Sequence, residues 1–449
     1  MPRPAASQPG SSAVTEARRA AALLLADLRS GELLDPAFDS RVSPLDARDR
    51  RWTQELLYGT LRRRSRIDAI LDARVRGGLA RLDPDLVDLL RLGVSQLLFM
   101  NSVPAYAAIA QTVELAKERH GLGASKLANA VLRRVDRERS GSQLEMSVPG
   151  DPVDAAALTH SHPRWIVARW VARWGLEETE RLLGANNVEA PTVLRPYGVV
   201  REQLEAMLES AGVHVGEVPL VPDSIELSGG AALTELGAYR KGLFFVQDPA
   251  ATLVSRYAAI APGSVVADLC ASPGGKALEL ARSAAFVWAG DRSLVRAERL
   301  AANARRLDAR TVHTVVSDAR HPALRAVDAV LVDAPCTGTG TFRRHPDARW
   351  RLRISDLAVM AALQRSLLRG AASVVKPGGL LIYSTCSLEP EENDAQVERF
   401  LAESPEWQLE PPPEGTVPVS VLDAGRLRVL PQRHGVDGAF AARLRRLPT

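Results

Sequence analysis

The stretch Ser264–Lys276, SVVADLCASPGGK, decides the fold of the C-terminal half of the chain. It begins with a short apolar run, and a proline with two glycines follows. This pattern predicts a buried strand that ends in a tight turn, and the next residues, ALELARS, predict a helix. Glycines in such a turn let the backbone approach a ligand closely, and the start of a helix favours an anionic group.

Four more apolar runs follow, and each ends in polar residues. They are FVWAGD (286–291), TVHTVVSD (311–318), DAVLVDAP (328–335) and GGLLIYST (378–385). Helical segments lie between them, so the alternation predicts a doubly wound parallel α/β sheet with its ligand sites at the carboxyl ends of the strands. We expect RLRVLP (426–431) and AFAARLRR (439–446) to be the last strands of the same sheet.

The length and composition predict several folded domains. With 449 residues, 46% of them apolar and 24% charged, the chain is too long for one domain and too apolar to be disordered throughout. The expected order is a disordered tail (1–14), an all-α helical bundle (15–140), a linker (141–153), a small α/β module (154–245) and the doubly wound domain (246–449).

The bundle is predicted from helical periodicity. Apolar residues recur three and four positions apart in segments such as ALLLADLRSG and DLVDLLRLGVSQLLFM, which indicates about six short helices. Asp49 near the start of one helix and Pro104 between two later ones fit the chemistry of helix ends. The segment SGSQLEMSVPGDP then interrupts the periodicity, and we place the linker there.

Cysteine usage and hydropathy indicate a soluble protein of the cytoplasm. No stretch approaches the roughly 18 uninterrupted apolar residues that a membrane-spanning helix needs. The N-terminus lacks the apolar segment of a signal peptide. Three cysteines are too few for a disulfide framework, and their spacing does not resemble a zinc ligand set.

Basic residues are concentrated in the N-terminal third. The chain has 57 Lys and Arg against 53 Asp and Glu, while residues 1–140 have 23 against 17. Most of the basic residues are arginine, and the cluster Arg62-Arg63-Arg64-Ser65-Arg66 suggests a polyanionic partner. The alternative is that a genome rich in arginine codons places arginines on solvated helix faces, which explains the same charge. Both interpretations stay open.

Acidic residues end successive strands beside the glycine turn. Asp291 comes 23 residues after Asp268, where it can accept hydrogen bonds from ribose hydroxyls. Asp318 ends the next strand, where a carboxylate can bind the exocyclic amine of adenine. A single acid of this kind is more often a turn former. Asp268, Asp291 and Asp318 together with a glycine turn indicate an adenosine-type cofactor. The turn is not a Walker A loop, since Ala277 follows Lys276.

Two cysteines lie in polar turns directly after adjacent strands, Cys336 in DAPCTGTG and Cys386 in STCS. A thiolate beside an adenosine cofactor suits methylation of C5 of a pyrimidine, because a nucleophile must first add to C6 before C5 can react. A second thiol or a base can then remove the C5 proton. Asp333 is the candidate for stabilising charge on the base. Cys270 is expected to be a small packed residue.

These motifs resemble one known family. DLCASPGGK, DAPCTGTG with FRRHPDARW, STCS with PEEN, and LPQRHGVDGAFAARL are similar to the RNA 5-methylcytosine methyltransferases of the NOL1/NOP2/Sun family. DRRWTQELLYGTLRRR, LRLGVSQLLFMNSVPAYAAI, KLANAVLRR, SHPRW and GLFFVQDPAA resemble its RsmB subgroup, also called Fmu or Sun. In that subgroup a NusB-like helical domain precedes a Rossmann-like class I methyltransferase domain.

The resemblance implies S-adenosylmethionine as the cofactor. It implies binding by Cys270, Ala271, Ser272, Pro273, Gly274, Gly275, Lys276, Asp291, Asp318 and Asp333. It also implies that Cys386 attacks C6 and Cys336 assists release, an order that the residue chemistry alone leaves open. Ser272 stands where alanine is usual and Ala277 where threonine is usual, and the lost hydroxyl is expected to weaken cofactor binding somewhat.

We therefore expect an RNA cytosine-C5 methyltransferase that acts on small-subunit (16S) ribosomal RNA as a monomer, without a metal or a membrane partner. The target base has to be unpaired or flipped. Arg343, Arg344 and His345 are expected to clamp RNA phosphates or to form a solvated basic turn. Two alternatives remain open: the same reaction on transfer RNA, and a non-catalytic NusB-like RNA-binding or antitermination factor.

Overall fold

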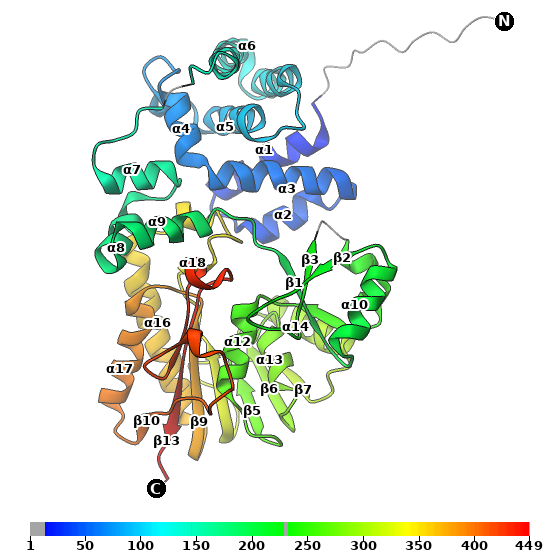
Figure 1. The fold of residues 1–449 in the computed structure, drawn as a ribbon, viewed down its shortest axis with the longest axis vertical. Helices are drawn as coiled ribbons and strands as arrows, with labels where there is room; N and C mark the ends of the chain where they lie inside the picture. Colours follow the sequence, from blue (N-terminus) through cyan, green and yellow to red (C-terminus); the bar gives the residue numbers. More distant parts are fainter. Residues whose placement is uncertain (1–13, 145, 229–231, 449) are drawn as a thin grey trace, which may run out of the picture. The chain divides into compact units, whose positions relative to one another are not determined.

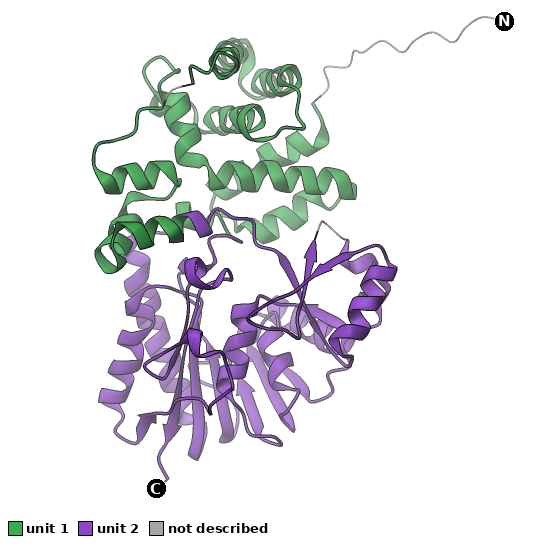
Figure 2. Ribbon diagram, viewed as in Figure 1, with its two compact units in different colours: residues 1–183, 345–350 green, residues 184–344, 351–449 purple. Residues whose placement is uncertain are grey.

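The computed structural model describes residues 14–144, 146–228 and 232–448 (Figure 1). The disordered tail predicted for 1–14 therefore lies outside the described residues, except for Val14. The chain forms two compact units (Figure 2): unit 1 runs to residue 183 and includes 345–350, and unit 2 comprises 184–344 and 351–449. No helix among the described residues has the length and apolar character to cross a membrane.

Unit 1 is helical, as the periodicity predicts. Asp46 begins one helix by accepting a hydrogen bond from the backbone N–H of Asp49, at 2.8 Å, and Pro104 directly precedes another. Leu24, Leu57 and Leu90 are among the fully buried side chains of its core. The helices are α1 (Glu16–Arg29), α2 (Leu34–Val42), α3 (Ala47–Arg62), α4 (Arg64–Asp72), α5 (Pro84–Phe99), α6 (Ala105–Ser140), α7 (Pro152–Thr159), α8 (Arg164–Trp174) and α9 (Leu176–Ala185).

Unit 1 contains two segments that lie outside the helical domain expected for 15–140. Helices α7–α9 belong to it, whereas the sequence reading groups them with the small module from 154 onward. The reason is packing: α7 lies against α4, and the Ser161 hydroxyl accepts a hydrogen bond from the backbone N–H of Ser65, at 2.8 Å. Unit 1 also takes in residues 345–350, where the Trp350 indole donates to the Leu61 carbonyl at 2.8 Å.

The main sheet of unit 2 contains every strand predicted from Ser264 onward, in the order β11-β12-β13-β9-β8-β5-β6-β7, with β10 paired to β13. The five strands from β9 to β7, at one end of this order, are parallel, while the C-terminal strands run antiparallel. The strands are β5 (Val265–Asp268), β6 (Phe286–Asp291), β7 (Val312–Val316), β8 (Val327–Asp333), β9 (Val375–Thr385), β10 (Trp407–Leu409), β11 (Leu422–Asp423), β12 (Arg426–Val429) and β13 (Ala439–Arg446).

Helices cover both faces of this sheet, which confirms the doubly wound class. Successive strand residues face opposite sides, so Val266 joins the core under α12–α14 while Ala267 joins the core under α16 and α17. The strand order reverses at β5, between β6 and β8, where ligands bind in folds of this class. The helices of this part of unit 2 are α12 (Pro249–Ala258), α13 (Gly275–Leu280), α14 (Leu294–Arg306), α16 (Ile354–Ser373), α17 (Asp394–Glu403) and α18 (Pro431–His434), while α15 (Ala348–Arg351) lies almost wholly in unit 1.

A second, antiparallel sheet forms the small α/β module, with strand order β2-β3-β1-β4. Its core includes Leu194, Leu204 and Phe244. The elements are β1 (Thr192–Pro196), α10 (Arg201–Ser210), β2 (His214–Gly216), β3 (Ile225–Ser228), α11 (Gly237–Arg240) and β4 (Phe244–Val246).

Candidate active site

The carboxyl end of β5 carries a buried acid, Asp268. Its side chain is fully buried, and among the described residues neither carboxylate oxygen has a hydrogen-bond partner. Burial and the nearby charge of Asp333 raise the pKa of Asp268 to about 7. A buried, unpartnered carboxylate is costly unless a cation compensates it, so this position suits a positively charged ligand group.

The glycine turn after β5 leaves no room for side chains. Gly274 has φ +112°, in the left-handed region that favours glycine. A Cβ on Gly275 would lie 2.8 Å from the side-chain nitrogen of Gln247. The backbone conformation therefore favours glycine at Gly274 independently of any ligand, whereas a side chain at Gly275 would require Gln247 to move.

Two further predicted acids lie at or just beyond the carboxyl ends of β6 and β7. Asp291 is buried, accepts from the Ser293 backbone N–H at 2.9 Å and pairs with Arg296 at 3.2 Å. Asp318 is more exposed, and its hydrogen bonds from Arg320 lower the pKa of Asp318 to about 2. Asp291 thus resembles a constrained ligand-binding acid more than Asp318 does.

An ion pair joins the glycine turn to the end of β8. The Lys276 ammonium lies 2.6 Å from Asp333 Oδ2, and the Ser384 hydroxyl donates to Asp333 Oδ1 at 2.8 Å. Burial acts to lower the pKa of Lys276, but the charges of Asp333, Asp268 and Cys386 outweigh it, so this pKa is raised. Lys276 therefore stays charged, close to Cys386.

The two cysteines predicted to share one site are in contact. Cys336 follows β8, Cys386 follows β9, and their sulfur atoms lie 3.3 Å apart. The hydrogen bond with Cys386, burial and the Glu392 carboxylate raise the pKa of Cys336 well above its usual value. Cys336 is thereby held as a thiol that can donate to the sulfur of Cys386. Cys270 packs at the edge of the core under α16 and α17.

A buried carboxylate that the sequence reading left without a role, Glu392, holds the two cysteine turns together. Its Oε1 accepts from the Thr337 backbone N–H at 2.9 Å and from Gln364 Nε2 at 3.0 Å. Its Oε2 accepts from the hydroxyls of Thr337 and Ser387. The residues flanking both cysteines are therefore fixed to one fully buried side chain. The motif PEEN was noticed in the sequence, but local pattern carries no sign of these long-range bonds.

Backbone contacts reinforce this arrangement. The Gly340 N–H donates to the Cys386 carbonyl at 2.9 Å, and the Gly438 N–H donates to the Gly340 carbonyl at 2.8 Å. A Cβ on Gly340 would meet the Cys386 carbonyl oxygen at 2.6 Å, so the close approach requires glycine.

The three basic residues expected to clamp RNA lie in different surroundings. Arg343 is buried and pairs with Asp437 at 2.9 Å. Arg344 pairs with Asp437 and with Asp248, at 2.7 and 2.6 Å. His345 is more exposed and belongs to unit 1. Their part in RNA binding stays a prediction.

These features fit S-adenosylmethionine. Asp268 offers an unpartnered carboxylate for a cationic group, the glycine turn gives close backbone approach, and Asp291 offers a carboxylate for hydroxyls. A doubly wound sheet with such a turn at its switch point is the architecture of the class I S-adenosylmethionine-dependent methyltransferases.

Comparisons with known proteins give the particular family. Family models match residues 258–445 as 16S rRNA methyltransferase RsmB/F, 15–137 as NusB, and 162–234 as the ferredoxin-like domain of RsmF/B-like methyltransferases. The probable ribosomal RNA small subunit methyltransferase B of Synechocystis sp. is 33% identical, covering 96% of this chain and 99% of the relative. The chain belongs to the RsmB/F methyltransferase family.

Other relatives agree with this assignment. The ribosomal RNA small subunit methyltransferase B of Vibrio cholerae is 34% identical, with 91% of each chain covered. The crystal structure of PH0851 superposes with a TM-score of 0.81 at 28% identity, covering 96% of this chain and 98% of that one. A methyltransferase homologue from Pyrococcus horikoshii superposes with a TM-score of 0.57 at 27% identity, over 67% of this chain and 100% of the other.

Proposed function

We propose that the protein methylates C5 of a cytosine in small-subunit ribosomal RNA, with S-adenosylmethionine as methyl donor. The 3.3 Å contact between the sulfurs of Cys336 and Cys386, beside the Lys276–Asp333 pair, carries this proposal. A thiolate is the group that C5 chemistry needs, because only addition at C6 makes C5 nucleophilic.

The residues of the site have different roles in this reaction. Cys386, as thiolate, adds to C6 of the cytosine. The π electrons of the C5=C6 bond then form a C4=C5 enamine, and those of C4=N3 move onto N3. Asp333 and Lys276 present an acceptor and a donor for the polar edge of the base, which stabilises that charge. Cys336, held protonated, donates to the Cys386 sulfur and stabilises it as the attacking and leaving thiolate.

When bound, S-adenosylmethionine supplies an electrophilic methyl group to C5. Loss of the C5 proton to a base and β-elimination of Cys386 then restore the aromatic ring and free the enzyme. All of these protein groups lie in unit 2 of one chain, so we propose that a monomer suffices.

The choice of substrate is supported by the relatives, several of which are named as small-subunit ribosomal RNA methyltransferases. The NusB match over 15–137, with its arginine cluster, supports RNA as the partner. The bacterial relatives named for ribosomal RNA support the cytoplasm as the place of the reaction.

Bisulfite sequencing of ribosomal and transfer RNA, from cells with and without the gene, tests the proposal. One cytosine of 16S RNA should lose its protection only in the deletion strain. A change confined to transfer RNA would name the other substrate, and no change in either RNA would favour a non-catalytic RNA-binding factor.

Replacing Asp291 by alanine is expected to weaken S-adenosylmethionine binding roughly 10- to 100-fold, since hydrogen bonds to a charged acceptor would be lost. Titration calorimetry measures this directly. Glu298→Ala, which changes an exposed acid on α14, is the matched control and should leave affinity unchanged. An unaltered affinity in Asp291→Ala would contradict the ribose role.

Cofactor affinity is also expected to depend on pH through Asp268. Below about pH 7 this carboxyl is protonated in the free protein, and a cationic ligand favours the ionised form. Affinity should therefore rise as pH rises, roughly tenfold between about pH 6 and 8. Calorimetry in buffers of different ionisation enthalpy would detect the released proton. Asp268→Asn should abolish the dependence, and a flat profile in the native protein would refute this assignment.

A further inference from the structure

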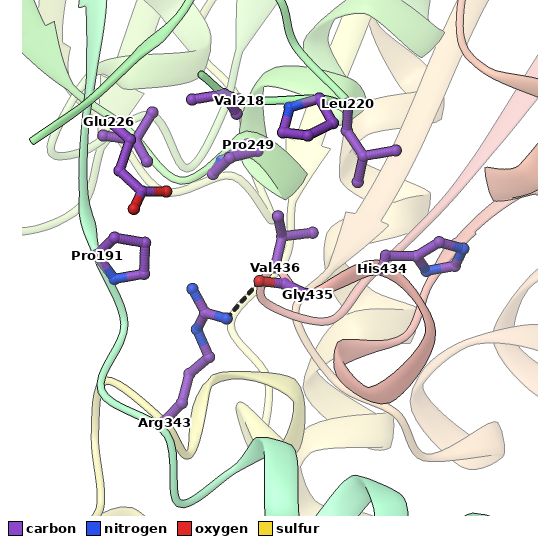
Figure 3. Close-up of a pocket in the computed structure, with 11 residues that line it drawn as sticks. Pro191, Val218, Leu220, Glu226, Pro249, Arg343, His434, Gly435 and Val436 are labelled. Carbon is purple, nitrogen blue, oxygen red and sulfur yellow. Dashed lines mark hydrogen bonds between the residues drawn. The ribbon is translucent and has the colours of Figure 1, made fainter. Parts of the chain in front are cut away.

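Unit 2 contains a cavity of about 260 Å³ that has no part in the chemistry above (Figure 3). Its walls come from the small sheet and from the segment that follows α18. Apolar side chains form most of them, including Pro191, Val193, Pro219 and Val436. The volume is slightly below the roughly 300–1,000 Å³ of ordinary small-molecule pockets, so it suits one ring system.

Two charged side chains extend toward this space from opposite sides, Glu226 of β3 and Arg343 (Figure 3). Arg343 is fixed by its bond to the Gly435 carbonyl, at 2.7 Å, and by Asp437. Glu226 is half-buried, and among the described residues its carboxylate has no hydrogen-bond or ion-pair partner. The cavity therefore offers a rigid cationic wall and an available acceptor.

The cavity is built on the same loops as the cysteine pair. Arg343 stands seven residues after Cys336 in the loop that follows β8. The segment that supplies Gly435 and Val436 continues to Gly438, which donates to Gly340, and Gly340 in turn donates to the Cys386 carbonyl. The cavity and the cysteine pair are therefore held by one connected set of loops.

The chemistry selects a nucleobase over other parts of an RNA. A flat ring fits between rigid apolar walls, whereas a phosphate would be repelled by Glu226 and disfavoured by the prolines and valines. A carboxylate accepts from the amino group of a base, as acidic residues do with the N4 amine of cytosine. Unpaired bases are the parts of RNA that proteins read on their edges.

We propose that this cavity binds one unpaired nucleobase of the substrate RNA close to the target cytosine, and that Glu226 selects a base with an exocyclic amino group. The proposal rests on the proposed function, because it needs an RNA held at the cysteine pair. It assigns Glu226 a role in specificity that the methylation chemistry itself does not require.

The test is a base-by-base exchange around the methylated cytosine. Substrate RNAs carry uracil or an abasic nucleotide at each flanking position in turn, and kcat/KM is measured with the native protein and with Glu226→Gln. At one position, uracil should lower the kcat/KM of the native protein roughly tenfold. Glu226→Gln should lose this discrimination at that position alone, since its amide can donate to the uracil carbonyl.

Glu202→Gln, an exposed change on α10 of the same small module, is the matched control and should behave as the native protein. The proposal is overturned if no position shows discrimination that depends on Glu226, or if Glu226→Gln slows all substrates alike. If the RNA is methylated but no position shows discrimination that depends on Glu226, the role of the cavity is rejected and the proposed function is retained. No methylation of any RNA by the native protein rejects both.

Discussion

Replacing Cys386 by alanine is expected to lower methyl transfer at least about 10³-fold and to abolish any covalent complex with RNA, because the group that adds to C6 is gone. Cys336→Ala should instead accumulate a covalent protein–RNA complex. Its sulfur lies 3.3 Å from that of Cys386, where it stabilises the departing thiolate. Without that donor, β-elimination slows more than addition does.

Denaturing gels of each variant, incubated with substrate RNA and S-adenosylmethionine, distinguish these outcomes by the slowly migrating band. The double variant Cys336→Ala/Cys386→Ala is the control and should form no band. A band in Cys386→Ala together with none in Cys336→Ala would reverse the two roles. Equal bands in both single variants would argue against a dedicated nucleophile.

The second large effect is expected at Glu392. Replacing it by alanine removes the acceptor of four hydrogen bonds and leaves the backbone N–H of Thr337 without its acceptor, while Gln364 keeps only its bond to the Pro335 carbonyl. Breaking such a buried network costs about 3–5 kcal/mol of unfolding free energy, or roughly 10 °C in melting temperature. Activity should fall as well, because the cysteine turns lose their common anchor.

Differential scanning calorimetry measures this loss. Glu392→Gln keeps the shape and one acceptor oxygen, so it should lose clearly less stability than Glu392→Ala. Glu406→Ala, an exposed change just after α17, should stay within about 0.5 kcal/mol of the native protein. Melting temperatures that are equal in Glu392→Ala and Glu406→Ala would show that the turns hold without this anchor.

Elements with strong local patterns were predictable from the sequence. The parallel strands could be predicted because each is an apolar run closed by polar turn residues, as in Ser264–Lys276. Strands β2 and β3 could not, since three or four residues of mixed polarity give no periodic signal. The antiparallel direction of β13 also depends on pairing with β9, which local sequence does not encode.

The residues of the site likewise differ in whether the sequence could predict them. The cysteines and strand-end acids were predictable because residue type and position both indicate chemistry. Glu392 was not, because its partner Thr337 lies 55 residues earlier in the chain, and only the fold brings the two together. Asp268 is one of those strand-end acids, but its burial without a hydrogen-bond partner can be seen only once the sheet is assembled.

The placement of residues 345–350 in unit 1 determines where the protein can be divided by truncation. Arg349 is 1% exposed there, and burial, reinforced by Arg62, lowers the pKa of Arg349 to about 9. Trp350 packs against the same helical core. Segments of the two units therefore alternate along the sequence, and no single truncation point separates them. A truncation that removes residues 1–183 is therefore expected to leave Arg349 and Trp350 without the Ser161 and Leu61 carbonyls that accept their hydrogen bonds in unit 1.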